Sequence, residues 1–488
     1  MPSPDLSAIP RSTDSRIVSR RRLLGGALAG AGSVAVLAAC SSTPASPGGS
    51  TGTGPGATAT SGTLDLPGGA SALGAGSFSL FSDPDLNFQA LFALGGAGVN
   101  SEVGEVITAV DQANAAPGGA TYQSFYDAFV AMGNALDEKA TASAKAGHVV
   151  SARAQYLRAA QYFNQALFFV LGTSTPDAEE QVYTTMNGAF VEAARLMDPV
   201  WEPVEIPYQG TTLPGYFLAA RGGSGRRPTV IVNNGSDAQL ADLWAYGGYA
   251  AVERGWNALI FEGPGQGANL FVKQMPFTPA WNEVITPVVD FLIARPDVDA
   301  SKIALTGWSF GGALVARAAA VEKRLAAVVS DPGFMSAFRS YPTFLQKLAQ
   351  DGDQQQVNAA WGATVVEGAT PAQHFLLQKR LEIYTKDALL EARQGKIPSD
   401  WYTISRAIES FDLEPVVKDI STTYLVVQYE GDTSFPGAAQ SLFDALPGKN
   451  KTFVNFTAAE GAQFHDAPMA PQYRNEVIFD WLDETVGA

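Results

Sequence analysis

The sequence has 488 residues, of which 46% are hydrophobic and 16% are charged, and its formal net charge at pH 7 is −16. This balance is typical of a folded protein with a large core and excludes an intrinsically disordered chain. The negative charge argues against a nucleic-acid partner, because such proteins need a basic surface to displace counterions from phosphate.

The first 39 residues have the pattern of an export signal. Residues 19–24 read S-R-R-R-L-L, a twin-arginine signature, and the apolar run after them is too short to span a membrane stably. Residues 37–40, L-A-A-C, resemble a bacterial lipobox, in which the cysteine is lipidated and becomes the new N-terminus. We therefore predict a twin-arginine lipoprotein signal peptide over 1–39, lipidation at Cys40, and a lipid anchor outside the cytoplasmic membrane. A plain secretory signal with an incidental cysteine is the alternative.

A tether and a helical region follow. Residues 41–61 contain only small and polar residues with glycine and proline, so we predict a flexible tether over 40–80. From there to about residue 200 the pattern is helical, most clearly over 149–170, where apolar residues recur at three- and four-residue steps. We predict a helical cap domain over 81–200.

From residue 201 onward, short apolar runs alternate with helical stretches. Residues 203–208 and 213–219 flank a turn and predict an entry hairpin. Near-continuous apolar runs of the kind found in buried parallel strands follow at 229–233, 257–261, 302–306, 326–330 and 422–427, and a last strand is expected at 451–456. The sequence predicts a mostly parallel, doubly wound sheet over 201–488. Residues 334–419 are too long for one crossover and predict a helical insertion after the sixth strand.

A G-x-S-x-G motif occupies residues 307–311, between an apolar strand and a good helix-forming run. In this motif the serine lies on a strained strand-to-helix turn, where side chains two positions away would collide with the backbone unless they are glycine. The context predicts that Ser309 is a nucleophile.

The chain has only three histidines, at positions 148, 374 and 465. In an α/β-hydrolase the nucleophile, the acid and the base follow one another along the chain in that order, and His465, after the last strand, satisfies it. We predict His465 as the base. For the acid we choose Asp432, in the loop after the strand at 422–427, with Glu430 as the near rival. Asp331, at the end of an earlier strand, is a second rival.

The oxyanion requires two backbone N–H groups. We expect them from Phe310, immediately after the nucleophile, and from Ser236, in the loop after the first buried strand. Residues 262–267, E-G-P-G-Q-G, fit the dinucleotide fingerprint only loosely and lack the lysine of a P-loop, so we interpret them as a tight strand-to-helix turn near the site. The sequence has no Cys or His pair at ligand spacing, so neither a metal nor another cofactor is expected.

Together these motifs resemble the capped α/β-hydrolases that include 2,6-dihydroxypseudooxynicotine hydrolase, the fungal polyketide-shortening hydrolases and the FrsA-like esterases. The matching stretches are residues 147–148, 151–153, 156–162, 263–267, 307–312, 330–333 and 461–465. The resemblance implies an α/β-hydrolase fold whose helical cap closes over Ser309. It implies cleavage of an ester or of a carbon–carbon bond next to a ketone. It also implies an assisting role for Asp237, which matches an acidic residue of the oxyanion loop in at least one relative.

We therefore expect a serine hydrolase that forms an acyl-enzyme. The aromatic residues near the motifs, Trp308, Phe310 and Phe464, and the helical caps favour a mid-sized, largely apolar substrate with a carbonyl group, and Trp308 is expected to contact it. His148, at the start of the clearest cap helix, is expected to be a capping or packing residue or to touch substrate from the cap side. A peptidase and a non-catalytic binding lipoprotein are the alternatives, and a homo-oligomer is compatible with either.

Overall fold

The computed structural model describes residues 79–222 and 225–487. The predicted signal peptide, Cys40 and nearly all of the predicted tether lie outside the described residues. Within the described ranges, no helix combines the length and the apolar character needed to cross a membrane.

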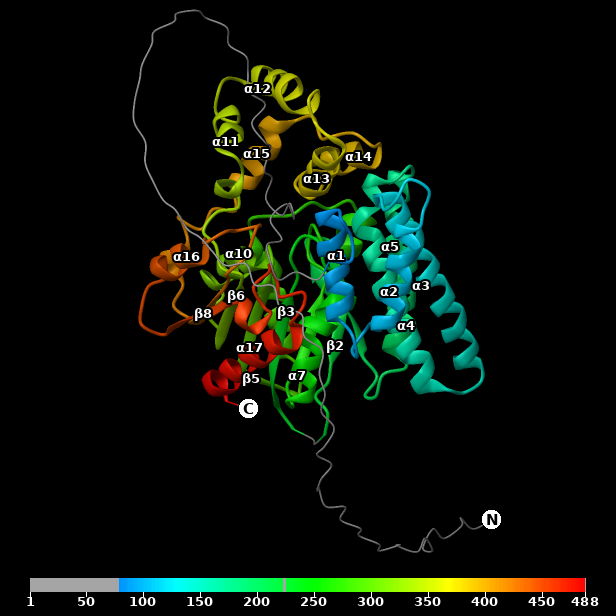
Figure 1. Ribbon diagram of the computed structural model, residues 1–488. Helices are drawn as coiled ribbons and strands as arrows, with labels where there is room; N and C mark the ends of the chain where they lie inside the picture. Colours follow the sequence, from blue (N-terminus) through cyan, green and yellow to red (C-terminus); the bar gives the residue numbers. More distant parts are fainter. Residues whose placement is uncertain (1–78, 223–224, 488) are drawn as a thin grey trace, which may run out of the picture. The chain divides into compact units, whose positions relative to one another are not determined.

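The described part of the region predicted to form a cap is built from helices, drawn in blue to teal in Figure 1. Each begins where a small polar residue or a turn interrupts the pattern: the Asp83 carboxylate accepts hydrogen bonds from the first turn of one helix, and the Thr121 hydroxyl does so for another. The helices are α1 Pro84–Gly95, α2 Val103–Asn114, α3 Tyr122–Lys145, α4 Val149–Phe169 and α5 Glu179–Arg195.

The described residues also form one eight-stranded sheet in the order β1-β2-β4-β3-β5-β6-β7-β8. The strands β1 and β2 form the predicted antiparallel hairpin, β2 pairs antiparallel with β4, and all other neighbours are parallel. The prediction of a mostly parallel sheet is confirmed. The strands are β1 Glu202–Tyr208, β2 Thr211–Leu218, β3 Arg227–Asn233, β4 Asn257–Phe261, β5 Val298–Trp308, β6 Ala327–Asp331, β7 Thr423–Tyr429 and β8 Lys451–Phe456.

Helices alternate with the parallel strands and bury the central ones on both faces, which is why these strands are apolar without interruption. These helices are α6 Leu240–Leu243, α7 Tyr249–Glu253, α8 Gly267–Phe271, α9 Trp281–Ile293, α10 Gly311–Ala319, α16 Ala439–Ala445 and α17 Pro471–Val486. One strand is longer than expected. The sequence predicted residues 302–306, but β5 begins at Val298, because Val298 pairs with Arg227 across an irregularity in the register.

Between β6 and β7 the chain forms the predicted helical insertion. A stacked pair of buried indoles, Trp361 and Trp401, with ring centroids 4.7 Å apart, gives it a small core. Its helices are α11 Thr343–Leu348, α12 Gln354–Trp361, α13 Pro371–Leu381, α14 Lys386–Arg393 and α15 Trp401–Glu409. A buried ion pair, Arg393 Nε to Glu179 Oε2 at 2.9 Å, joins α14 to α5. The insertion is thereby attached to the N-terminal helices.

The closing helix α17 is fixed by a buried charge at the end of β6. Arg474 donates from Nε to Asp331 Oδ2 at 2.6 Å and from Nη1 to the Tyr246 carbonyl at 2.6 Å, and the Tyr429 hydroxyl donates to Asp331 Oδ1 at 2.5 Å. Both charged side chains are buried. Asp331 therefore neutralises Arg474 and does not contact His465, so the structure does not place this rival in the position of the acid.

Replacing Arg474 by Met should destabilise the protein strongly. The substitution keeps most of the apolar bulk but leaves the Asp331 carboxylate buried without its cation, which costs about 3–5 kcal/mol in the free energy of unfolding. Denaturant unfolding followed by circular dichroism measures this loss. The double variant Arg474→Met, Asp331→Asn should recover part of it. A single variant as stable as the unmodified protein would show that the pair does not hold α17.

Candidate active site

Ser309 lies on the predicted sharp turn between β5 and α10. Its φ is +56°, in the left-handed region that non-glycine residues rarely adopt. A Cβ atom on Gly307 would lie 2.2 Å from the Gly311 carbonyl oxygen, and one on Gly311 would lie 2.6 Å from the Asn234 carbonyl oxygen. The two motif glycines are therefore required by close backbone contacts, as the sequence predicted.

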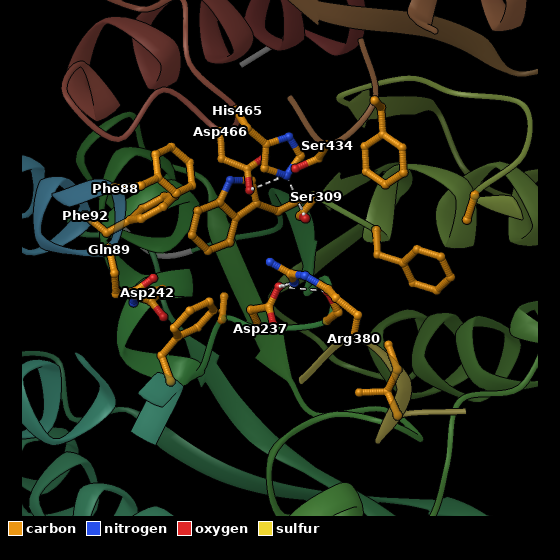
Figure 2. A pocket seen from close by; sticks show the side chains of 18 of the residues that line it. Phe88, Gln89, Phe92, Asp237, Asp242, Ser309, Arg380, Ser434, His465 and Asp466 are labelled. Carbon is orange, nitrogen blue, oxygen red and sulfur yellow. Dashed lines mark hydrogen bonds and ion pairs between the residues drawn. The ribbon is translucent and has the colours of Figure 1, made fainter. Parts of the chain in front are cut away.

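The structure brings Ser309, His465 and Asp432 into one hydrogen-bonded chain. Ser309 Oγ lies 2.9 Å from His465 Nε2 (Figure 2). His465 Nδ1 lies 3.0 Å from Asp432 Oδ2. The other carboxylate oxygen of Asp432 accepts the N–H groups of Ser434 at 2.7 Å and Phe435 at 3.0 Å. These bonds fix the carboxylate so that it faces the imidazole.

The near rival for the acid, Glu430, points elsewhere. Its side chain is exposed, and its carboxylate accepts the Ala458 N–H at 2.8 Å. Of the acids considered from the sequence, only Asp432 contacts His465.

The loop that carries Ser236 packs directly against the turn at Ser309. A Cβ atom on Gly235 would lie 2.6 Å from the Trp308 carbonyl oxygen and 2.7 Å from Ser309 Cβ, so only glycine permits this approach. Across the described part of the chain, neither the Ser236 N–H nor the Phe310 N–H has an intramolecular acceptor. Both residues line the cavity in front of Ser309, as their predicted role as oxyanion donors requires.

The turn at 262–267 supports that loop. It connects β4 to α8, and the Gln266 side-chain amide donates to the Asn234 carbonyl at 2.8 Å and to the Gly235 carbonyl at 3.1 Å. The interpretation of these residues as a strand-to-helix turn near the site agrees with the structure.

The cavity in front of Ser309 is walled mainly by aromatic rings from three parts of the chain. The N-terminal helices, the sheet and the insertion all contribute, through Phe88, Phe92, Phe168, Trp308, Tyr341 and Tyr384. Figure 2 shows Phe88 and Phe92 from α1 near His465 and Asp466. Trp308 lines the cavity as expected, whereas Phe464 is buried outside the lining.

His148 does not reach this cavity. It precedes α4 with an exposed side chain and makes no side-chain capping bond, so neither the capping role nor contact from the cap side is observed. His374, in α13, lies with Nε2 3.0 Å from the Gly395 carbonyl oxygen.

Three charged residues that line the cavity were not predicted from the sequence: Asp242, Asp466 and Arg380. The first is Asp242. Its carboxylate accepts hydrogen bonds from the side chains of Asn164 at 2.6 Å and Gln161 at 3.1 Å, both on α4. Burial raises its pKa. This network fastens α4 to the segment after β3, and no sequence signal marks it because its partners are far apart along the chain.

The second, Asp466, directly follows the base. Its Oδ2 lies 3.3 Å from His465 Nε2, the nitrogen that also faces Ser309, and its backbone is strained at φ +64°. Burial raises the pKa of Asp466 well above its ordinary value. Burial opposes the charged form of His465, but the carboxylates of Asp432 and Asp466 outweigh this effect and raise the pKa of His465 to about 9. The adjacency was visible in the sequence, but a local sequence pattern does not show which way the side chain points.

The third, Arg380 of α13, forms an ion pair with Asp237, the residue singled out by resemblance. Ser236 Oγ also lies 3.0 Å from Asp237 Oδ2. Burial alone would raise the pKa of Asp237, but the charges of Arg380 and Lys379 outweigh it and lower this pKa below its ordinary value. Asp237 is therefore an ionised acceptor at neutral pH. Figure 2 shows this pair in the same cavity as Ser309.

Comparison with known proteins agrees with the fold. A model of the "Esterase FrsA-like" family matches residues 126–350. The chain is 33% identical over 272 residues to the α/β-hydrolase psoB of Aspergillus fumigatus, which covers 53% of this chain and 60% of the relative. The chain has the α/β-hydrolase fold, and its curated relatives are named as hydrolases. It is also 30% identical over 268 residues to the 20-hydroxy-prefusarin hydrolase FUS2 of Gibberella moniliformis, covering 53% of this chain and 63% of that relative.

Among solved structures, this chain is similar to 2,6-dihydroxy-pseudo-oxynicotine hydrolase, with a TM-score of 0.58 and 19% identity over 82% of this chain and 95% of the other. It is also similar to AbyA5, with a TM-score of 0.56 and 16% identity over 83% of this chain and 95% of the other. At these identities the likeness shows the fold. The resemblance predicted from the motifs is confirmed, and the match to curated relatives spans less than two thirds of their length.

The charges around His465 predict an alkaline dependence for the reactivity of Ser309. Only the neutral imidazole accepts a proton, so labelling of Ser309 by a fluorophosphonate should increase as the pH rises through about 9. In Asp466→Asn one carboxylate that raises this pKa is gone, and the midpoint should move to lower pH. The measurement is the labelling rate as a function of pH, with Glu430→Gln as the matched surface control. A midpoint near the ordinary value of 6.5 in the unmodified protein, or one that Asp466→Asn does not move, would contradict this assignment.

Proposed function

We propose that this α/β-hydrolase is a serine hydrolase that cleaves an ester, or a carbon–carbon bond next to a ketone, through an acyl-enzyme. The observation that carries the proposal is the hydrogen-bonded chain from Ser309 Oγ through His465 to Asp432. A nucleophile within hydrogen-bond reach of a base, with the base oriented by a third group, is the arrangement that activates serine.

In this mechanism His465 Nε2 accepts the Ser309 proton as Oγ attacks the carbonyl carbon. The negative charge that develops on the carbonyl oxygen is stabilised by the free N–H groups of Phe310 and Ser236. Asp432 accepts the Nδ1–H of His465, fixes its tautomer and stabilises the imidazolium. The imidazolium then returns the proton to the leaving alkoxide, or to the leaving carbanion if a carbon–carbon bond breaks. Water activated by the same histidine releases the acid.

The walls of the cavity support a mid-sized, largely apolar carbonyl substrate. Aromatic rings dominate the lining, and the N-terminal helices and the insertion both contribute to it. The relatives whose names state a substrate act on 20-hydroxy-prefusarin and on 2,6-dihydroxy-pseudo-oxynicotine. We infer a substrate of similar bulk for this chain. For Asp237 we propose a role in holding Arg380 rather than in donating a proton, since its pKa is lowered.

Substitutions within the chain of three residues test the proposal. Ser309→Ala and His465→Ala should abolish turnover of a nitrophenyl ester, and Asp432→Asn should lower kcat by roughly four orders of magnitude, because it favours the wrong tautomer of the base. Glu430→Gln, two positions away and exposed, is the matched control and should be unaffected. Steady-state kinetics together with fluorophosphonate labelling measure both effects.

The alternatives give different results in the same experiment. A folded protein in which Ser309 is never labelled would point to a binding protein that has kept the fold. A protein that is labelled and cleaves peptides but no ester or β-diketone would be a peptidase.

We further propose that the protein is exported by the twin-arginine route and held at the cell envelope by lipid on Cys40. The support is the sequence pattern of residues 19–24 and 37–40. Because the net charge of −16 repels anionic headgroups, the lipid rather than a basic surface would hold the protein at the membrane.

Changing Cys40 to Ala should release the protein from membranes. Without the thiol no lipid is attached, and the net negative charge of the chain does not favour binding to anionic headgroups. Cell fractionation with a salt wash, compared with the unmodified chain, measures the effect. A Cys40→Ala protein that still sediments with washed membranes would refute the lipoprotein assignment.

A further inference from the structure

We propose that Arg380 binds a planar, delocalised oxyanion of the substrate, a carboxylate or the enolate of a β-diketone, and so selects substrates that join such a group to an apolar skeleton. This inference rests on the proposed function, since it concerns the same cavity. It adds a polar requirement to a site whose walls otherwise favour apolar groups.

The first observation is the set of N–H groups that Arg380 leaves free. A guanidinium has five N–H donors. In the described part of the chain, Arg380 donates from Nη1 to Asp237, and its Nη2 donates to no protein acceptor; Nε also has no acceptor but is buried, so the Nη groups are the donors that a ligand can reach. The side chain retains 19% of its exposure and lines the cavity in front of Ser309. A guanidinium with unused donors that borders a cavity can bind an anion through two parallel hydrogen bonds.

The second observation is that another residue already attaches the insertion to the rest of the chain. Arg393 joins Glu179 of α5 and also donates from Nη2 to the Phe271 carbonyl at 2.7 Å. Unlike Arg393, Arg380 also borders the substrate cavity, so fastening the insertion does not by itself account for its position.

The third observation is the electrostatic balance of the cavity. Asp237 is paired with Arg380, Asp466 lies 3.3 Å from His465, and burial raises the pKa of Asp242. The cavity therefore repels an incoming anion less strongly than three unpaired, ionised carboxylates would. The charge of Arg380 also reaches His465, whose pKa it lowers, so a bound anion would lie within electrostatic range of the reacting atoms.

The fourth observation is the surroundings of the guanidinium. The Phe168 ring centroid lies 6.0 Å from Arg380 Cζ, and Tyr341 and Tyr384 line the same cavity. The charge of Arg380 also acts on both tyrosines. Aromatic faces with two hydroxyl groups beside a cation suit a ligand whose anionic end is attached to an aromatic or aliphatic body.

The test uses binding, so that it does not depend on turnover. In a Ser309→Ala parent, calorimetry should show phenylbutyrate binding at least about tenfold more tightly than the isosteric amide phenylbutanamide. Arg380→Gln in this parent should remove the preference. Arg380→Lys keeps the charge without the planar fork and should retain only part of it.

A second arm distinguishes the two sources of the anion. Benzoylacetone, a β-diketone, should show the absorbance of its enolate on binding to the parent, and should not do so in Arg380→Gln. If phenylbutyrate alone depends on Arg380, the site is for carboxylates; if benzoylacetone alone does, it is for enolates. Circular dichroism of each variant confirms folding, and Arg380→Lys serves as the test variant if Arg380→Gln does not fold.

A catalytic arm compares nitrophenyl heptanoate with the mono-nitrophenyl ester of heptanedioate. Arg380→Gln should reduce kcat/KM for the anionic ester about tenfold more than for the neutral one. If neither ester is cleaved and Ser309 is not labelled, the proposed function fails while the binding arm still decides the role of Arg380. Equal binding of the carboxylate and the amide, with no enolate of benzoylacetone bound, would overturn the inference, as would preferences that Arg380→Gln leaves unchanged.

Discussion

The close contact between two backbone turns, one at Gly235 and one at Ser309, is the constraint on which the candidate active site depends. These turns end β3 and β5, which are parallel neighbours, so their carboxyl ends meet at the same edge of the sheet. With a Cβ 2.7 Å from that of Ser309, any other residue at position 235 would push the turns apart. The contact places the free N–H of Ser236 and that of Phe310 on one cavity, beside the Ser309 hydroxyl. Because both turns are anchored to paired strands, the sheet holds the proposed oxyanion donors at fixed positions relative to Ser309.

The rest of the site comes from segments outside the sheet, and buried polar contacts attach each of them. Asn164 and Gln161 of α4 bind Asp242, and Arg380 of α13 pairs with Asp237. Such contacts are strongly directional, since a buried carboxylate without its partner carries a large desolvation cost. They therefore fix the orientation of the N-terminal helices and of the insertion over the cavity, whereas the aromatic rings give it volume and an apolar surface. Several of the polar residues that assemble the cavity, such as Asp242 and Arg380, also line it, so they are in a position to contact the substrate.

The charged residues of the cavity act on His465 in opposite directions. His465 lies between Asp432 on one nitrogen and Asp466 near the other, at 3.0 Å and 3.3 Å. The first contact orients the ring, and the second increases its basicity from the side on which Ser309 and the substrate react. Arg380 acts in the opposite direction and lowers the pKa of the same imidazole. An anion bound at Arg380 would weaken this opposing effect. The base would then respond to the substrate through the electrostatic field alone.

The sequence by itself determined the parts of this protein that depend on local spacing. Apolar runs separated by helical stretches predicted the parallel sheet, and the glycines around Ser309 predicted the strained turn, because both follow from the geometry of a few consecutive residues. The scarcity of histidines and the chain order then singled out His465. Tertiary structure decided the rest. Glu430 and Asp432 are two residues apart in one loop, and only the path of that loop turns Asp432 toward the imidazole and Glu430 toward solvent. Arg380 and Asp237 are separated by 143 residues, so their pairing follows from how the insertion folds back over the sheet, which no local pattern encodes.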